Sequence, residues 1–223
     1  MPAYEKRFFY YHFKGPNLKV LFEEWHGILT WFEKKKYLED LPYWYLERTN
    51  IGHLALAAYQ LSGFPLQEFS IVKKGKAVSK VGRKRAPSSG RADLYLYIPK
   101  LSGFNVNIEA KQLWYPLVNA SQSTDRIENS LKNAIKDCKD LRGSYGKKKL
   151  AIVFVVAYST KKLWEDISYF RNKMKAEGER LKVSFLTFHI SPSHISMSKK
   201  RLLKDINNKY YWYPCIAVFG KFV

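Results

Sequence analysis

The segment 90–114 constrains the fold more than any other part of the sequence. Two runs within it alternate strictly between apolar and polar residues, and Pro99, Ser102 and Gly103 lie between the runs. The apolar positions are Leu94, Leu96 and Ile98 in the first run and Val106, Ile108 and Ala110 in the second. A period of two is typical of a β-strand with one buried face, and Pro and Gly favour a turn. The sequence therefore predicts a β-hairpin over 93–111.

The register of this hairpin follows from its apolar side chains, because a slip of one residue would turn every side chain to the other face. The matching register has three pairs, Ile98 with Val106, Leu96 with Ile108 and Leu94 with Ala110. The same register places Asp93 opposite Lys111 and diagonal to Glu109. Diagonal neighbours across two strands lie roughly 7–8 Å apart. We therefore expect two carboxylates and a lysine to converge at the end of the hairpin.

Two carboxylates beside a lysine suggest chemistry on phosphodiester bonds. Asp93 and Glu109 supply the hard oxygen ligands that Mg²⁺ (or Mn²⁺) prefers, and the Ala110 carbonyl is a further candidate ligand. A bound metal ion makes hydroxide available near neutral pH. Lys111 shares a face with Glu109, which leaves two roles open. Its amine can shift its pKa and help to deprotonate or orient the attacking water, or its charge can stabilise the phosphate in the transition state.

Asp93, a spacer, and Glu109-Ala110-Lys111 on the next strand resemble the signature of the PD-(D/E)xK, or restriction-endonuclease-like, nuclease superfamily. The proline of that signature is replaced here by Ala92. The resemblance covers roughly 47–190 and implies an αβββαβ core. It also implies a Mg²⁺-dependent deoxyribonuclease that leaves a 5′-phosphate, with Asp93 and Glu109 as metal ligands.

A predicted helix over 45–60 carries a further candidate. Glu47 lies on the apolar face of this helix, where a carboxylate is costly unless it meets a partner. The resemblance implies that Glu47 serves the metal site, holding a second ion or its water, and the alternative is a structural ion pair with an arginine. His53 falls about 120° away on the helical wheel, and the sequence leaves open which of the two completes the site. Asn50, near the same face, and Gln112, directly after the motif, are accessory candidates.

The other elements follow from their hydrophobic periodicity. Helices are predicted over 18–37, 125–141 and 163–180, and strands over 69–72, 150–158, 183–190 and 215–219. The near-continuous apolar run 150–158 is typical of a strand buried on both faces. We therefore expect an α/β fold with a restriction-endonuclease-like core, a central mixed sheet flanked by helices. A single nuclease-like domain would span 1–223, with an aromatic helical N-terminal extension (1–43), a catalytic core (44–190) and a C-terminal extension (191–223).

The charge of the chain indicates a polyanionic partner. Lys and Arg number 39 against 19 acidic residues, a net charge of +20. Such an excess is typical of proteins that bind a phosphate backbone, whereas no basic amphipathic helix favours a membrane. The basic residues expected to bind nucleic acid lie just before or beside Asp93, and they are Lys80, Arg83, Lys84, Arg85 and Arg91. The alternative for this run is a solvated charged loop.

Cysteine and histidine positions indicate no further metal site. Cys138 and Cys215 lack metal-ligand spacing and are expected to be free thiols in a reducing compartment. His189 and His194 have no partner at metal spacing and are interpreted as structural. The chain has no apolar run of about 18 residues and no recognisable signal peptide, so we expect a cytoplasmic protein associated with nucleic acid.

Three functions are compatible with these patterns. The leading one is a metal-dependent DNA endonuclease, with DNA favoured over RNA and a homodimer expected for cutting both strands of a duplex. The second is a non-catalytic nucleic-acid-binding module with a nuclease-like fold, and the third is a basic RNA-binding protein whose hairpin carboxylates are incidental. The intact Asp, Glu and Lys set favours the first. The sequence does not separate restriction, resolvase, repair and mobile-element roles.

Overall fold

The computed structural model describes residues 7–34, 43, 46–73, 88–117, 124–142, 148–159, 165–191, 203–204 and 210–223. The strands are β1 (Phe8–His12), β2 (Phe64–Lys73), β3 (Ser88–Ile98), β4 (Phe104–Pro116), β5 (Leu141–Arg142), β6 (Lys148–Ser159), β7 (Phe185–Ile190), β8 (Leu203–Lys204) and β9 (Tyr210–Phe222). The α-helices are α1 (Lys19–Lys34), α2 (Glu47–Gln60), α3 (Thr124–Asp140) and α4 (Glu165–Arg180), and a 3-10 turn spans Pro99–Leu101.

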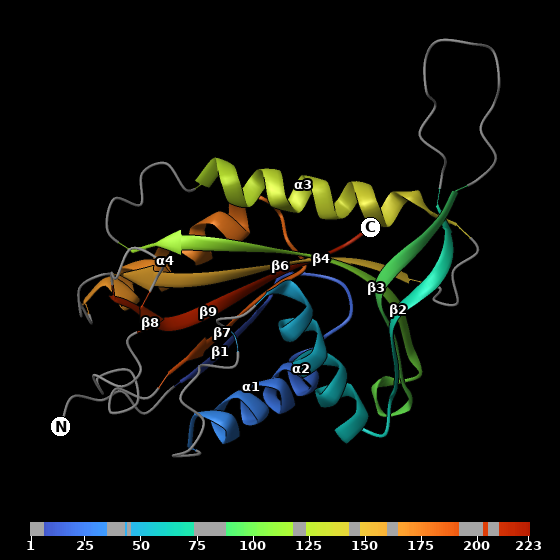
Figure 1. Ribbon diagram of the computed structural model, residues 1–223, viewed down its shortest axis with the longest axis horizontal. Coiled ribbons are helices and arrows are strands. Elements are labelled where there is room, and N and C mark those ends of the chain that lie inside the picture. The colour runs from blue at the N-terminus through green and yellow to red at the C-terminus, as the bar shows by residue number, and fades with distance from the viewer. Residues whose placement is uncertain are drawn as a thin grey trace, which may run out of the picture.

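The strands form a mixed sheet in the order β1-β7-β9-β6-β4-β3-β2-β5, and β8 pairs with β9. Helices α1 and α2 lie on one face of this sheet, and α3 and α4 on the other (Figure 1). The predicted α/β class, with a mixed sheet flanked by helices, is therefore confirmed. Among the described residues, no helix has the length and apolar character needed to cross a bilayer.

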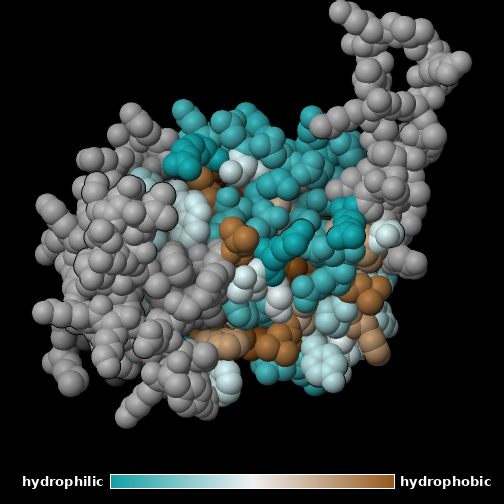
Figure 2. Space-filling model, in the orientation of Figure 1, coloured by the Kyte–Doolittle hydropathy of each residue, from teal (hydrophilic) through white to brown (hydrophobic). Residues whose placement is uncertain are grey.

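Strand β6 shows why the sheet is covered on both faces. Ile152 and Phe154 pack with α1 and α2, whereas Ala151 and Val153 pack with α3 and α4. All four side chains are fully buried, which confirms the expected strand with two buried faces. The outer face of α3 is hydrophilic, as the upper part of Figure 2 shows, and carries the exposed lysines Lys132, Lys136 and Lys139.

Segments expected as additions at the two ends of the chain contribute strands to the same sheet. Residues 8–12 form β1, which pairs antiparallel with β7, and β9 lies between β7 and β6. From sequence, 1–43 was assigned to an aromatic helical extension because the apolar residues of 18–37 occur at helical spacing, and no strand was predicted there. Aromatic residues also favour strands, and those of β1 pack on both faces of the sheet, Phe8 and Tyr10 on one and Phe9 and Tyr11 on the other.

The predicted hairpin is present, but its register differs by two residues from the expected one. Leu94 pairs with Ile108, Leu96 with Val106 and Ile98 with Phe104. The reason is a shorter connection, in which the 3-10 turn is followed by Ser102 and Gly103, both with positive φ. Buried Phe104 thereby joins the apolar face. An even shift preserves which side chains share a face, but if the ladder is continued, Asp93 falls opposite Glu109 rather than Lys111.

Among the described residues, the chain order through the expected core is α2, β2, β3, β4, α3, β6, with the 3-10 turn between β3 and β4 and the two-residue β5 between α3 and β6. Strands β4 and β6 are parallel, and α3 connects them, while β2, β3 and β4 are antiparallel neighbours. This arrangement brings the end of the hairpin, the N-terminus of α2 and the C-terminal half of α3 together, as the contacts below establish.

Candidate active site

The site forms where β3 separates from β4. The last pair of their ladder is Leu94 with Ile108. At the next positions along β4, the backbone N–H of Ala110 donates to Oδ2 of Asp93 over 2.8 Å, and the N–H of Gln112 donates to the Glu47 carboxylate. Two N–H groups two residues apart point to the same edge of a strand. Two carboxylates from different elements are therefore fixed along one edge of β4.

Glu109 and Lys111 face α3, on the opposite side of the sheet from Ala110. Glu109 is buried beside Cys138, and burial is the main reason that the pKa of the Cys138 thiol is raised to about 12. Nζ of Lys111 lies 2.8 Å from Oδ2 of Asp137. The structure confirms that Cys138 and Cys215 are free and buried.

The charge state of Lys111 follows from its surroundings. Burial by itself lowers the pKa of an ammonium group. The hydrogen bond and charge of Asp137, together with the charges of Glu47 and Asp93, outweigh burial, so the pKa of Lys111 is raised above its ordinary value. Lys111 is therefore a cation near neutral pH, held among three carboxylates.

Glu47 is the first residue of α2 and lines a cavity of about 180 Å³ with Asp93. Burial raises the pKa of Glu47, and the charges of Asp93 and Asp137 raise it further, while Lys111 opposes them. Two of the sequence candidates thus share one cavity. The expected alternative, in which Glu47 serves an arginine ion pair, is not favoured, because the cation that acts on it is Lys111.

The accessory candidates contact each other, and His53 does not join them. Nδ2 of Asn50 donates to Oε1 of Gln112 over 3.0 Å and to the carbonyl of Tyr43 over 3.3 Å. Gln112 therefore points toward α2 while Lys111 points toward α3, as the alternation predicts. The ring of His53 lies against Phe32, with centroids 5.3 Å apart. Of the two residues left open by the sequence, Glu47 is the one at the site.

Three residues of this neighbourhood were missed by the sequence analysis, namely Asp137, Arg48 and Glu68. Asp137 lies three residues after Ala134 and one before Cys138, at the edge of the apolar stripe of α3. This position beside the apolar face could have identified it as a candidate. Arg48 follows Glu47, and its partner Glu68 lies on β2. Arg91 is placed beside the same Glu68. Lys80, Arg83, Lys84 and Arg85 lie outside the described residues.

We call the place where β3 separates from β4 the fork. The side chains there have oxygen atoms suited to binding a hard cation. Within the part of the chain that the structure describes, no three His, Cys, Asp or Glu side chains are gathered closely enough to hold a metal ion. The donors available are nevertheless carboxylate and carbonyl oxygens, which Mg²⁺ prefers. Burial is the main reason that the pKa of Glu47 is raised, and the charges of Asp93 and Asp137 add to it; an added cation would stabilise the charged carboxylate. The residues present therefore fit a magnesium or manganese ion.

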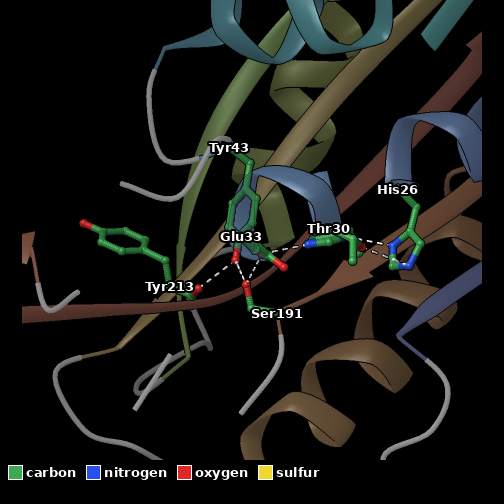
Figure 3. Close-up of polar contacts among 7 residues, drawn as sticks. His26, Thr30, Glu33, Tyr43, Ser191 and Tyr213 are labelled. Carbon is green, nitrogen blue, oxygen red and sulfur yellow. Dashed lines mark hydrogen bonds and ion pairs between the residues drawn. The ribbon is translucent and has the colours of Figure 1, made fainter. Parts of the chain in front are cut away.

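A second polar cluster lies between α1 and β7 (Figure 3). Its centre is Glu33, whose Oε1 accepts hydrogen bonds from Nε2 of His189, over 2.9 Å, and from the Ser191 hydroxyl. The Tyr43 hydroxyl lies 2.5 Å from Oγ of Ser191 and donates to the carbonyl of Tyr213 over 2.9 Å. Glu33 and His189 are fully buried side chains. We name these residues, with His26, the Glu33 cluster.

His26 closes the Glu33 cluster on the side of α1. Its Nδ1 lies 2.7 Å from Nδ1 of His189. Burial, followed by the charges of His189 and Arg7, lowers the pKa of His26 to about 3, so its imidazole is neutral at ordinary pH. His189 was interpreted from sequence as structural, because no carboxylate or histidine lies at metal-ligand spacing from it. Its carboxylate and histidine partners are now visible, whereas His194 lies outside the described residues.

Comparison with known proteins adds no relative to this picture. No family model, curated protein or solved structure matches the chain.

Proposed function

We propose that this protein is a metal-dependent DNA endonuclease that hydrolyses phosphodiester bonds at the fork between β3 and β4. One observation carries the proposal. Backbone N–H groups of Ala110 and Gln112 hold the carboxylates of Asp93 and Glu47 along one edge of β4, within the segment that also bears Glu109 and Lys111. Three acidic side chains from other parts of the chain, Glu47, Asp93 and Asp137, act on Lys111 of this segment, although like charges repel.

Two further observations support the proposal. The element order α2, β2, β3, β4, α3, β6 corresponds to the αβββαβ core implied by the resemblance to PD-(D/E)xK nucleases. The net charge of +20 suits a polyanionic substrate. DNA rather than RNA is the proposed substrate, and a homodimer is the proposed form for cutting both strands of a duplex.

The proposed division of labour assigns each residue one task. Asp93, Glu109 and the Ala110 carbonyl would hold Mg²⁺ or Mn²⁺, and Glu47 would hold a second ion or its water. When bound, such an ion activates water and offsets charge on the phosphate. Asn50 fixes Gln112, whose N–H in turn orients Glu47. The N-terminus of α2 adds a positive dipole end beside the cavity, which favours an anionic substrate.

Lys111 acts as a cation in this scheme. Its raised pKa argues against a neutral amine that removes a proton from water. Of the two roles left open by the sequence, the favoured one is stabilisation of the negative charge that develops on the phosphate. Asp137 would keep the ammonium group in place until substrate arrives, since their salt bridge is 2.8 Å long and only partly exposed.

The test is cleavage of supercoiled plasmid in Mg²⁺, in Mn²⁺ and in EDTA. We expect nicking or linearisation with either metal and none in EDTA. Asp93→Asn and Lys111→Ala should each lower the cleavage rate by at least about 100-fold. Titration calorimetry with Mn²⁺ should show weaker metal binding for Asp93→Asn, which links the loss to the ion rather than to folding.

Matched variants outside the site control for charge. Asp125→Asn and Lys132→Ala alter exposed residues of α3 with the same charge changes, and both should cleave like the unaltered protein. Full metal-dependent cleavage by Lys111→Ala would contradict the proposal. DNA binding without cleavage by any form of the protein would favour the non-catalytic binding module instead.

A further inference from the structure

Glu68 of β2 lies between two arginines beside the proposed active site. Its Oε1 is 2.7 Å from Nε of Arg48, and its Oε2 is 3.1 Å from Nη1 of Arg91. Arg48 belongs to α2 and Arg91 to β3, so the carboxylate bridges two elements. All three residues line the cavity of about 180 Å³ that also contains Glu47 and Asp93. This trio therefore borders the fork directly.

The position of Glu68 in the sheet is an unfavourable one for a carboxylate. The pairs Gln67 with Leu94 and Phe69 with Ala92 flank it, which puts Glu68 opposite Asp93 on the neighbouring strand. Like charges directly opposite each other destabilise a sheet. Glu68 also has a φ of 46°, in the left-handed region that non-glycine residues seldom adopt. The ion pairs with Arg48 and Arg91 explain why a carboxylate is found at this unfavourable position.

Arg48 and Arg91 have the geometry of an anion-binding site, and the carboxylate of Glu68 occupies it. Two guanidinium groups converge on two oxygens of one anion, the arrangement by which arginines bind carboxylates and phosphates. The side chains of Arg48 and Arg91 are 77% and 70% exposed, so the ion pairs are open to water. Exposed pairs add little to folding stability. An incoming phosphate can therefore displace Glu68 without disturbing the fold.

We propose that Arg48 and Arg91 form a clamp for a backbone phosphate of the DNA next to the one that is cut, and that Glu68 occupies this clamp in the free protein. The inference rests on the proposed function, since it takes DNA as the ligand. In the free protein, Glu68 holds both guanidinium groups at the rim of the cavity and so orders them in advance. On binding, the phosphate replaces the carboxylate, which makes Glu68 an internal competitor of the substrate.

The structure contains a matched control for this trio. Glu128 of α3 also bridges two cations, with Oε1 2.6 Å from Nζ of Lys132 and Oε2 2.9 Å from Nη1 of Arg180. Its side chain is 28% exposed, against 36% for Glu68. Glu128→Gln changes the net charge of the protein by the same amount as Glu68→Gln. Any gain in DNA affinity that depends on net charge alone will therefore appear in both variants.

The experiment measures binding of a short mixed-sequence DNA duplex in EDTA over a series of salt concentrations. Arg48→Ala and Arg91→Ala should each weaken binding and reduce the slope of log K against log salt by about 1, the effect of one lost phosphate contact. Glu68→Gln should tighten binding by about 3–10-fold, more than Glu128→Gln, because it removes an anion at a phosphate position. In the background of Arg48→Ala and Arg91→Ala together, Glu68→Gln should tighten binding no more than Glu128→Gln.

The clamp proposal would be contradicted if Glu68→Gln and Glu128→Gln changed DNA affinity equally. Equal changes in affinity for Arg48→Ala and Arg180→Ala would contradict it as well. The measurement separates the clamp from the proposed nuclease, because EDTA prevents metal-dependent cleavage. If the unaltered protein binds duplex DNA but never cuts it in Mg²⁺, the nuclease fails and the comparison of variants still decides the clamp. If the unaltered protein does not bind duplex DNA at all, both fail.

Discussion

Two polar clusters on this sheet hold their carboxylates in opposite ways. In the Glu33 cluster one carboxylate is fully buried and receives hydrogen bonds from His189 and Ser191. At the fork, Glu47 and Asp93 share an open cavity, and burial, followed by the charges of Asp93 and Asp137, raises the pKa of Glu47. Buried charges are tolerated when they are paired, and they are costly when like charges gather.

The difference suggests which cluster serves the fold and which serves function. The buried carboxylate of Glu33, paired with His189, ties α1 to β7. Carboxylates that crowd an accessible cavity lower the stability of the protein unless something else is bound, and perturbed groups of this kind concentrate at functional sites. The same substitution, Glu to Gln, should therefore have opposite consequences in the two clusters.

The largest effect on stability is expected from Glu33→Gln. The substitution removes the charge that strengthens the hydrogen bonds from His189 and Ser191, and it buries an amide group in place of an oxygen. We expect the free energy of unfolding to fall by about 2–3 kcal/mol, and by about 3–5 kcal/mol for Glu33→Ala. Urea unfolding followed by tryptophan fluorescence measures both values.

Glu23→Gln is the control for this prediction. Glu23 lies on the same helix, is 46% exposed and forms an exposed pair with Lys19 over 3.4 Å. Its substitution should change the free energy of unfolding by less than about 0.5 kcal/mol. A loss of similar size in both variants would show that the Glu33 cluster contributes no more to stability than a surface pair.

Glu47→Gln should have a smaller effect on stability and a larger one on activity. Gln keeps an oxygen for the N–H of Gln112 but removes a charge that burial and Asp93 disfavour. We expect the free energy of unfolding to stay within about 1 kcal/mol of the unaltered value, or to rise. Metal-dependent cleavage of plasmid should fall by about 10–100-fold. A stability loss like that of Glu33→Gln would place Glu47 with the structural carboxylates.

Local sequence patterns were sufficient to predict which faces of the strands and helix at the fork carry the candidate residues. The alternation of 93–111 identified the faces of the hairpin, and these survived the error in register because a shift of two residues keeps every side chain on its face. The helical spacing of 45–60 put Glu47 and Asn50 toward the sheet. In the structure Glu47 and Asp93 line one cavity, and the charge of Lys111 acts on Glu47, so local periodicity was sufficient to predict that these three residues lie near one another.

Other contacts depend on how distant elements pack, and no local pattern encodes them. Glu33 and His189 are 156 residues apart in the chain, and their contact follows from where α1 crosses β7. The pairing of Lys111 with Asp137 depends on the position of α3 over β4. Glu68 meets Arg91 through the pairing of β2 with β3. That pairing was not predicted from sequence, and the first strand was expected to begin at Phe69 rather than Phe64.

The smallest expected effect is a difference in how the buried histidines and Glu47 respond to acid. Burial lowers the pKa of His26 to about 3 and that of His53 to about 4, while in the unfolded chain both titrate near 6.5. As the pH falls below about 6.5, the unfolded state takes up protons first. Stability is therefore lost, by at most about 1.4 kcal/mol per pH unit for each histidine.

Glu47 should oppose this loss. Its pKa is raised above 4.5 in the folded protein, so over the interval just above 4.5 the folded state takes up the proton first and gains stability as the pH falls. The acid-induced loss of stability should therefore be steeper in Glu47→Gln and shallower in His26→Gln than in the unaltered protein. Urea unfolding at several pH values between about 7 and 4.5 measures these slopes. Parallel slopes in all three proteins would mean that neither cluster exchanges protons differently on folding, and the electrostatic contrast between them would then be lost.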